Sequence, residues 1–164
     1  MRLKDKTAII TGGGTGIGLA TARAFYQEGA KIILFGRRKE KLEKAVEKLG
    51  DSAVIVQGDM TNNKDLDQLI KETLHNFKKI DILVNNAGLF NGSPLHEISD
   101  SQWDEIMDIN IRSVFQLTRR VLPAMLSQKY GNIIHISSIL GLIAVPQVAA
   151  YNVSKGALNQ FSRS

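Results

Sequence analysis

Short apolar runs alternate with longer amphipathic stretches along the whole chain, and this alternation limits the folds that the chain can adopt. The runs are rich in isoleucine and valine, and their apolar residues are consecutive rather than alternating with polar ones. This is the pattern of strands that are buried on both faces of a sheet. The predicted strands are Thr7–Thr11, Lys31–Phe35, Ala53–Val56, Ile80–Val84 and Asn132–Ser137.

Helical patterns separate these runs. They cover Gly16–Glu28, Lys39–Leu49, Lys64–Phe77, a long stretch at Ser101–Gln128 and a last one from Tyr151 onward. Parallel strands need a crossover of about a dozen residues or more, which the helices between the runs supply. The chain is therefore predicted to form one α/β domain over residues 1–164, a doubly wound, Rossmann-like parallel sheet. Ser99 or Asp100 is expected to cap the long helix, and Pro123 to kink or break it.

Composition excludes several function classes. The chain has no cysteine, which rules out disulfides, cysteine nucleophiles and cysteine-bound metals. Its formal charge is +5, but the basic residues are mixed with acidic ones and only 6% of residues are aromatic, so no nucleic-acid partner is expected. The three histidines do not form a pattern typical of a metal site. Without a signal-peptide stretch or a bilayer-length apolar run, we expect a cytoplasmic protein with no membrane partner.

A glycine-rich segment, Thr11 to Gly18, follows the first predicted strand and opens the first predicted helix. Glycines at such a junction allow a tight turn and a close approach of the backbone to a pyrophosphate, and the helix N-terminus adds unpaired N–H groups. The segment lacks both the G-x-G-x-x-G spacing and the lysine of a Walker loop, which argues against phosphoryl transfer. We predict a dinucleotide site here, the alternative being a turn with a structural role only. The candidate cofactor-binding residues are Gly12, Gly14, Thr15, Gly16, Ile17 and Gly18.

The second predicted strand leads into Gly36, Arg37 and Arg38. A site for NAD would carry an acidic residue here, about 20 residues beyond the glycines, to bind the ribose 2′-hydroxyl. The lack of this carboxylate removes the repulsion of a 2′-phosphate, and the planar fork of an arginine can grip that group. The sequence therefore favours NADP(H) over NAD(H), unless the two arginines simply begin a solvent-exposed helix.

Tyr151 and Lys155 are one helical turn apart on the last predicted helix and share its face. Ser138 follows the last predicted strand, at the edge of the sheet where doubly wound folds bind ligands, and Asn110 lies in the long helix. A phenol is too weak a base at neutral pH, but a nearby ammonium favours its ionised form. These residues suit a carbonyl/alcohol interconversion, with Tyr151 as acid/base, Ser138 donating to the reacting oxygen and Asn110 holding a relay water. The alternative is a half-buried tyrosine beside a surface lysine.

The sequence resembles the classical short-chain dehydrogenase/reductase family over essentially all 164 residues. Thr11–Gly18 matches the family's T-G-x-x-x-G-I-G loop, Asn85–Gly88 its N-N-A-G and Tyr151–Lys155 its Y-x-x-x-K. Asn110 and Ser138 stand where the family has its catalytic asparagine and serine. The resemblance also implies cofactor contacts for Asp59, Met60, Asn86, Ala87, Gly88, Tyr151 and Lys155.

By this resemblance the protein is an oxidoreductase that interconverts a carbonyl and a secondary alcohol with NADP(H). It is most similar to the 3-oxoacyl-[acyl-carrier-protein] reductases, while sugar, steroid and other alcohol dehydrogenases share the same motifs. The apolar loop Ile139–Ala150 suits a hydrophobic carbonyl substrate, small or carrier-bound, better than a free sugar. A catalytically inactive dinucleotide-binding protein is the other alternative.

The resemblance carries two further expectations. Family members commonly form tetramers through the long helix and the helix of the tyrosine and lysine, so a homotetramer is expected here. The candidate contacts are Val114, Leu117, Val153, Ala157 and Phe161, the alternative being that these residues pack inside the chain. Family members also continue with further strands, a helix and a lobe over the substrate, none of which follows Ser164. We therefore expect this chain to be a C-terminally incomplete version of the fold.

Overall fold

The five predicted strands form one parallel sheet. In the computed structural model, which describes residues 1–164 except for the side chain of Asp51, the strand order is β3-β2-β1-β4-β5. The strands are β1 (Thr7–Thr11), β2 (Lys31–Gly36), β3 (Ala53–Gln57), β4 (Ile82–Asn85) and β5 (Asn132–His135). Each neighbouring pair is parallel, as crossover helices require. The predicted doubly wound α/β fold is confirmed.

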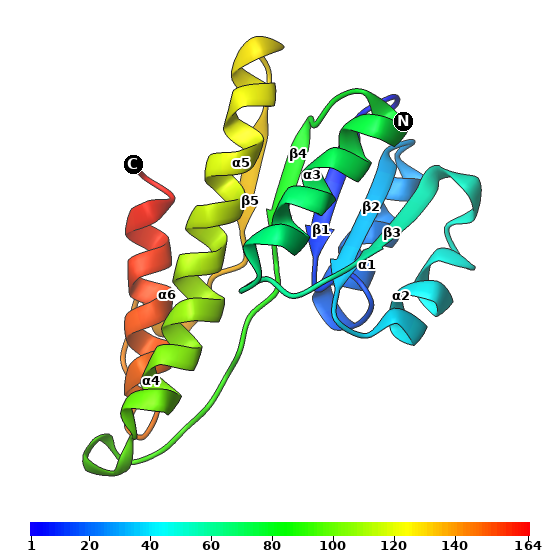
Figure 1. Cartoon of the computed structure of the whole chain (residues 1–164). Helices are drawn as coiled ribbons and strands as arrows, with labels where there is room; N and C mark the ends of the chain where they lie inside the picture. The colour runs from blue at the N-terminus through cyan, green and yellow to red at the C-terminus, as the bar shows by residue number, and fades with distance from the viewer.

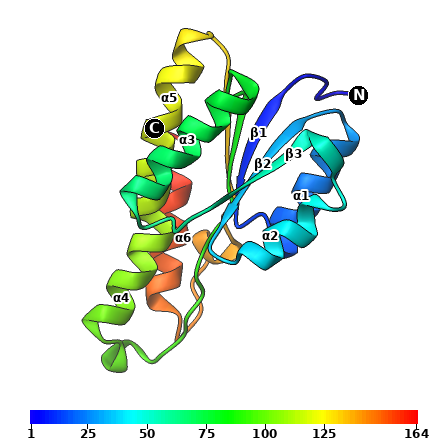
Figure 2. The same cartoon turned by 45° about the vertical axis from the view of Figure 1, so that its right-hand side comes forward.

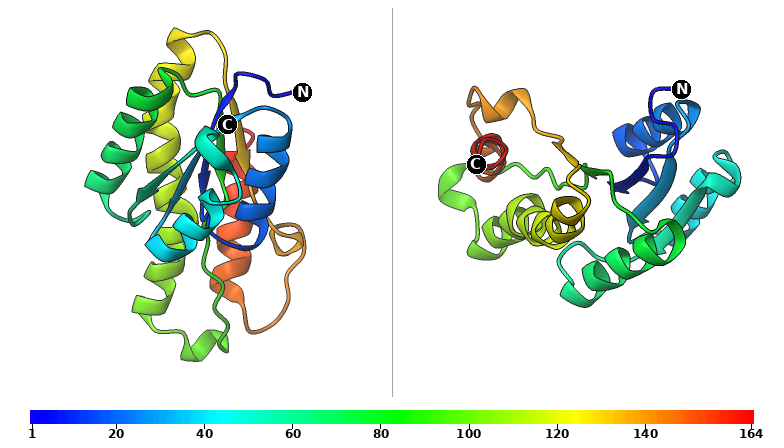
Figure 3. Two further views of the ribbon diagram at one scale, coloured as in Figure 1. Left: turned by 90° about the vertical axis from the view of Figure 1, so that its right-hand side faces the viewer. Right: turned by 90° about the horizontal axis from the view of Figure 1, so that it is seen from above.

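Helices cover both faces of this sheet (Figure 1). Figure 2 shows α4 (Asp100–Met107) and α5 (Ser113–Ser127) as one long rod, with α6 (Ala149–Phe161) behind it. The remaining helices are α1 (Gly16–Gln27), α2 (Lys39–Val46) and α3 (Asn63–Phe77). In the view from above in Figure 3, α1 lies on one side of the sheet, while α3 and α5 lie on the other. The α6 helix packs against α4 at the β5 side.

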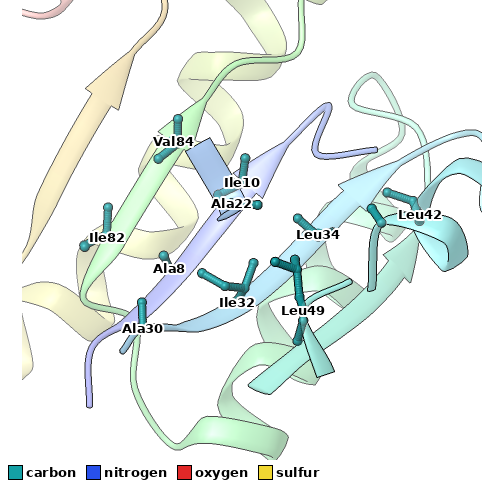
Figure 4. Close-up of a cluster of buried hydrophobic side chains, with 12 residues drawn as sticks. Ala8, Ile10, Ala22, Ala30, Ile32, Leu34, Leu42, Leu49, Ile82 and Val84 are labelled. Atoms are coloured by element: carbon teal, nitrogen blue, oxygen red, sulfur yellow. The ribbon is translucent and has the colours of Figure 1, made fainter. Parts of the chain in front are cut away.

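Successive residues of β1 point to opposite faces of the sheet, so its consecutive apolar residues enter two cores. Ala8 and Ile10 belong to the core beneath α1 and α2, which Figure 4 shows. Ile9 belongs to the core beneath α3 and α5. All three side chains are 0% exposed, and full burial of an isoleucine contributes about 1.5–3 kcal/mol to stability. The two cores fix the register of β1, because a slip of one residue would exchange its faces.

The outer strand β5 is less protected than the others. Its residues are half-buried or exposed, and Ile134 is 40% accessible, whereas every residue of β1 is buried. The backbone on the outer side of an edge strand is free to pair with a further strand. The sheet is therefore open on its β5 side.

The long helix predicted over Ser101–Gln128 is interrupted. It begins after Ser99, whose hydroxyl accepts from the backbone of Gln102 at 3.2 Å in a reciprocal capping box. A π-helical turn over Asp108–Arg112 then separates α4 from α5. Pro123 lies inside α5 without ending it, because it is on the exposed side of the helix, where water can reach the carbonyl that loses its partner. Of the kink or break expected at Pro123, the break does not occur, and the π-helical interruption lies earlier in the helix.

Two of the residues expected at a subunit interface are buried inside the chain. Val114 is 2% exposed and Leu117 is 0% exposed, with Leu117 in the core beneath α5. Neither side chain is accessible on the surface of the chain, and Leu117 packs in the core between α5 and the sheet. Of the two alternatives for Val114 and Leu117, the structure supports internal packing over a subunit contact.

Candidate active site

The glycine loop turns tightly at the carboxyl end of β1. Gly12 has a φ of +63°, a left-handed conformation that favours glycine, and its N–H donates to the carbonyl of Phe35 at 2.8 Å. A Cβ atom on Gly12 would lie 2.9 Å from Asn86 Nδ2 and 3.2 Å from Ala87 Cα. The missing side chain thus lets the loops that follow β1 and β4 approach each other closely.

Thr11 holds these two loops together. Its buried Oγ1 accepts from the backbone N–H of Asn86 at 3.0 Å and from that of Ala87 at 2.9 Å. Asn86 Nδ2 donates in turn to the carbonyl of Thr11 at 2.8 Å. The last residue of β1 and the first residues after β4 therefore form one hydrogen-bonded frame.

A cavity of about 300 Å³ opens at the carboxyl ends of the strands, where doubly wound folds bind their ligands. Most of the predicted cofactor-binding residues line it, namely Gly12, Gly14, Thr15, Arg37, Arg38, Asp59, Met60, Asn86, Ala87 and Gly88. Three of the predicted cofactor-binding residues of the glycine segment lie outside this lining. Gly18 is buried behind Gly12, while Gly16 and Ile17 are exposed at the start of α1.

The cavity also has lining residues that the sequence analysis missed. They are Gly36, Lys41, Leu42, Gly58, Leu89 and Ile109. Gly58 carried a weak signal, because it lies two residues after a predicted strand, near the position that Gly12 has after the first one. Lys41 and Ile109 carried none, because a lysine or an isoleucine within a helical pattern is equally compatible with an ordinary surface or core position.

Positive charge dominates one wall of the cavity. Arg37 and Arg38 line this wall, and Arg38 Nη2 donates to Thr15 Oγ1 at 3.3 Å. Arg37 Nη1 lies 3.9 Å from a carboxylate oxygen of Asp59. Burial raises the pKa of Asp59, but hydrogen bonds from Thr61 and the charge of Arg37 outweigh burial and hold this pKa below its ordinary value. Two guanidinium groups and one carboxylate line this part of the cavity, which leaves an excess of positive charge that suits a phosphate.

Asn110 lies in the π-helical turn and is 1% exposed. Its Nδ2 donates to the carbonyl of Leu89 at 2.9 Å and to Ser154 Oγ at 3.0 Å, and its Oδ1 accepts from the N–H of Leu89 at 2.7 Å. Ser154 Oγ donates in turn to the carbonyl of Tyr151 at 2.8 Å. Asn110 therefore joins the loop after β4 to α6, and π-turns are frequent at functional sites.

Lys155 is buried near Tyr151 on α6. Its Nζ lies 5.6 Å from the centre of the Tyr151 ring and donates to the carbonyl of Ile136 at 2.8 Å. Burial lowers the pKa of Lys155. A Cβ atom on Gly88 would lie 3.7 Å from this Nζ and 3.3 Å from Asn110 Oδ1. Because Gly88 also lines the cavity, the lysine and the asparagine stand at the end of the cavity.

Ser138 is placed differently. Its Oγ accepts from the N–H of Leu140 at 3.1 Å and caps the short turn Ile139–Gly141 after β5. It borders a second, more open hollow of about 540 Å³ that reaches along the end of α6 to Arg163. The structure thus links Asn110, Tyr151 and Lys155 to one another, while the hydrogen bond of Ser138 goes to its own turn.

The arrangement combines a cavity lined by two arginines with an ammonium beside Gly88 and a phenol next to that ammonium. Backbone N–H groups at the start of α1 and the two arginines suit the phosphates of a nucleotide. The phenol is suited to moving a proton to or from an oxygen atom next to that nucleotide.

Among the described residues, no three histidine, aspartate or glutamate side chains gather as a metal ion would require. None of the described helices is both long and apolar enough to span a bilayer.

Comparison with known sequences identifies the group of proteins that shares this arrangement. The family model described as short chain dehydrogenase matches residues 6–164. An uncharacterised oxidoreductase of Staphylococcus aureus (strain USA300) is 37% identical over 162 residues, which cover 98% of this chain and 70% of that protein. An uncharacterised oxidoreductase of Listeria monocytogenes is 38% identical over 161 residues, covering 96% of this chain and 65% of that protein.

Solved structures agree with the sequence comparison. The 3-ketoacyl-(acyl-carrier-protein) reductase of Brucella melitensis, solved with NADH, is 31% identical and superimposes with a TM-score of 0.94 over 98% of this chain and 69% of that one. A short chain dehydrogenase of Bacillus anthracis is 30% identical, with a TM-score of 0.93 over 98% of this chain and 68% of that one. The chain thus corresponds to somewhat more than two thirds of each of these two structures.

Proposed function

This chain belongs to the short-chain dehydrogenase family, a family of oxidoreductases, and we propose that it uses NADP(H) to interconvert a hydrophobic carbonyl compound and a secondary alcohol. The observation that carries the proposal is the position of Gly88. This residue lines the cavity and also lies close to Lys155 and Asn110, so that the helix carrying Tyr151 and Lys155 stands beside the cavity.

The residues around the cavity fit a nicotinamide dinucleotide. The glycine loop and the N-terminus of α1 would hold the pyrophosphate, and Asp59 and Asn86 would contact the adenosine and ribose parts. The cofactor supplies the hydride. The Brucella reductase was solved with NADH, so the preference for NADP(H) is supported by Arg37 and Arg38 of this chain.

Tyr151 is the proposed general acid in reduction and the general base in oxidation. Lys155 supplies a positive charge near the phenol, and the proposed hydrogen bond from Ser138 would stabilise negative charge on the reacting oxygen. Asn110 engages both backbone groups of Leu89, which leaves one lone pair on its Oδ1 for the proposed relay water. Its larger contribution is to position α6, through Ser154, against the cavity.

A 3-oxoacyl or similar hydrophobic compound is the proposed substrate, presented either as a small molecule or on a carrier. The loop after β5 exposes apolar side chains, and the Brucella protein acts on a carrier-bound ketoacyl group according to its name. Sugar, steroid and other alcohol substrates are the alternatives.

We also propose a homotetramer that contacts neighbours through Val153, Ala157 and Phe161 of α6, with Val153 46% exposed. Neither a membrane nor a nucleic acid is proposed as a partner, and location in the cytoplasm remains a prediction.

One experiment tests the reaction and separates an enzyme from an inactive dinucleotide-binding protein. NADPH and NADH consumption is followed by absorbance with an acetoacetyl thioester, simple ketones and aldose sugars. Tyr151→Phe should reduce turnover by about 10²- to 10⁴-fold while leaving NADPH binding intact. Tyr130→Phe, at an exposed tyrosine that packs against Lys6, is the matched control and should retain activity. A wild-type protein that binds NADPH but reduces none of these compounds would contradict the proposal.

A further inference from the structure

Two loops meet directly before α6. Residues 89–99 follow β4, and residues 139–148 follow β5 (Figure 1). The N–H of Ser93 donates to the carbonyl of Gln147 at 2.7 Å, and a parallel bridge joins Ser93 to Val148. The two loops are therefore clasped together one helical turn before Tyr151.

Phe90, on the first of these loops, is held against Tyr151. The two ring centres are 4.9 Å apart and the planes meet at 79°, an edge-to-face contact. The residue before it, Leu89, is fixed at both its N–H and its carbonyl by Asn110, so the backbone leading to the ring has little freedom. Phe90 is nevertheless 63% exposed. A ring that is oriented by its neighbours yet open to water can serve as a wall for a ligand.

The same two loops expose other apolar side chains, including Leu95 and Val145. The backbone at Val145 is anchored to α6, because Asn152 Nδ2 donates to the carbonyl of Val145 at 2.9 Å. Apolar groups that remain exposed on ordered loops beside a reactive group gain stability when a ligand covers them. A polyhydroxylated substrate would lose hydrogen bonds to water at such a surface without replacing them.

We propose that Phe90 is a specificity-determining residue of this site. Its ring forms the apolar wall that receives the hydrocarbon group bonded to the carbonyl carbon, next to the Tyr151 hydroxyl. The inference rests on the proposed carbonyl reduction and adds to it the side chain that selects aliphatic and aryl ketones or oxoacyl chains over sugars.

The test measures ketone binding in a complex that does not react. With oxidised NADP⁺ bound, a ketone is not reduced, so its Kd can be determined by calorimetry for 2-butanone, 2-hexanone and 2-octanone. In the wild type, each added methylene should tighten binding by about two- to fourfold, as expected when a CH₂ is partly or fully buried. Phe90→Ala should flatten this dependence to less than about 1.5-fold per methylene. Phe90→Leu, which keeps an apolar side chain, should restore most of it.

Two controls make the result specific. Tyr26→Ala removes a partly exposed aromatic ring from α1, away from the clasped loops, and should leave the chain-length dependence unchanged. The Kd for NADP⁺ and the melting temperature should be the same in the wild type and the Phe90 variants. If Phe90→Ala keeps the wild-type dependence, the role of Phe90 is wrong even though the wild type reduces ketones. If the wild type reduces no ketone with either nicotinamide cofactor, the proposed function itself is wrong.

Discussion

Asn85 Nδ2 lies 3.1 Å from His135 Nδ1, across the boundary between β4 and β5. The same amide nitrogen lies 3.3 Å from Thr118 Oγ1. Because the amide is a donor, this network assigns an acceptor role to Nδ1 and places the proton of the neutral imidazole on Nε2. In a protonated ring, Nδ1–H would face the N–H of Asn85 Nδ2. Two donors cannot bond to each other, so protonation would break this link between the two strands.

This relationship predicts a loss of stability in acid. Burial lowers the pKa of His135 below its unfolded value of about 6.5, so the unfolded chain binds the proton more tightly. The stability that the neutral ring contributes is fully present above pH 6.5, and it is lost as the pH falls through the lower pKa of the folded state. The melting temperature should therefore drop between pH 7 and pH 5, and His135→Gln should make this drop smaller. His96→Gln, at a side chain that is 82% exposed, is the control and should behave as the wild type.

A second prediction concerns Asn110. Asn110→Leu leaves the N–H and the carbonyl of Leu89 without their partner, and each unpaired group at this partly buried position costs up to about 1–3 kcal/mol. We expect a lower free energy of unfolding in urea together with a large loss of turnover. Asn110→Asp keeps an acceptor for the N–H of Leu89 but loses the donor, so it should be intermediate in stability. Equal stability of Asn110→Leu and the wild type would contradict this account.

A third prediction concerns Gly18, at the start of α1. A Cβ atom there would overlap the carbonyl oxygen of Gly12 and lie 2.6 Å from Asn86 Nδ2. The backbone of Gly12 cannot move away without distorting the cavity. Gly18→Ala should therefore lower the free energy of unfolding by about 1–3 kcal/mol, which is typical of overpacking. It should also weaken NADPH binding by roughly tenfold or more, because the displaced backbone lines the cavity. Ala20→Ser, on the exposed side of the same helix, is the control. The Kd can be followed by the fluorescence of bound NADPH.

A fourth prediction concerns cofactor choice. A charge-assisted hydrogen bond contributes about 1.5–3 kcal/mol, so Arg38→Ala should weaken NADPH binding by about 10- to 100-fold and NADH binding much less. Arg37→Ala should show a smaller effect, because Arg37 already faces Asp59. Lys39→Ala, at an exposed residue paired with Glu43, should leave both Kd values unchanged. Equal losses for NADPH and NADH would show that the arginines do not read the 2′-phosphate.

The sequence was sufficient where a local pattern and the tertiary structure require the same thing. Five consecutive apolar runs predicted the five strands, because a strand inside a two-faced sheet needs apolar residues at every position. Ile80 and Asp81 were predicted within the fourth strand, but β4 begins at Ile82. Asp81 instead accepts from the N–H of Thr7 through its side chain, a contact between segments far apart in the sequence.

The parts of the site that depend on such distant contacts were not predictable. The π-helical turn at Asp108–Arg112 has an ordinary helical composition, and its purpose appears only when Asn110 meets Leu89 across the fold. Lys41 became a cavity residue because α2 packs beside Gly14. The edge contact between Phe90 and Tyr151 likewise joins a residue of the loop after β4 to a residue of α6. Residue type and spacing indicate which chemistry is available, while the tertiary packing of the loops and helices determines which side chains come into contact.

The single hydroxyl of Thr11 has a consequence for how quickly the site can respond to a ligand. It anchors the loop after β1 to the loop after β4, which continues to Gly88 beside Lys155 and Asn110, so the fold itself fixes the two ends of the cavity relative to each other. The two loops lose their conformational entropy when the chain folds, so binding of a dinucleotide does not have to order either loop. Association at this site is therefore expected to proceed in one kinetic phase, limited by encounter rather than by a preceding rearrangement of the chain.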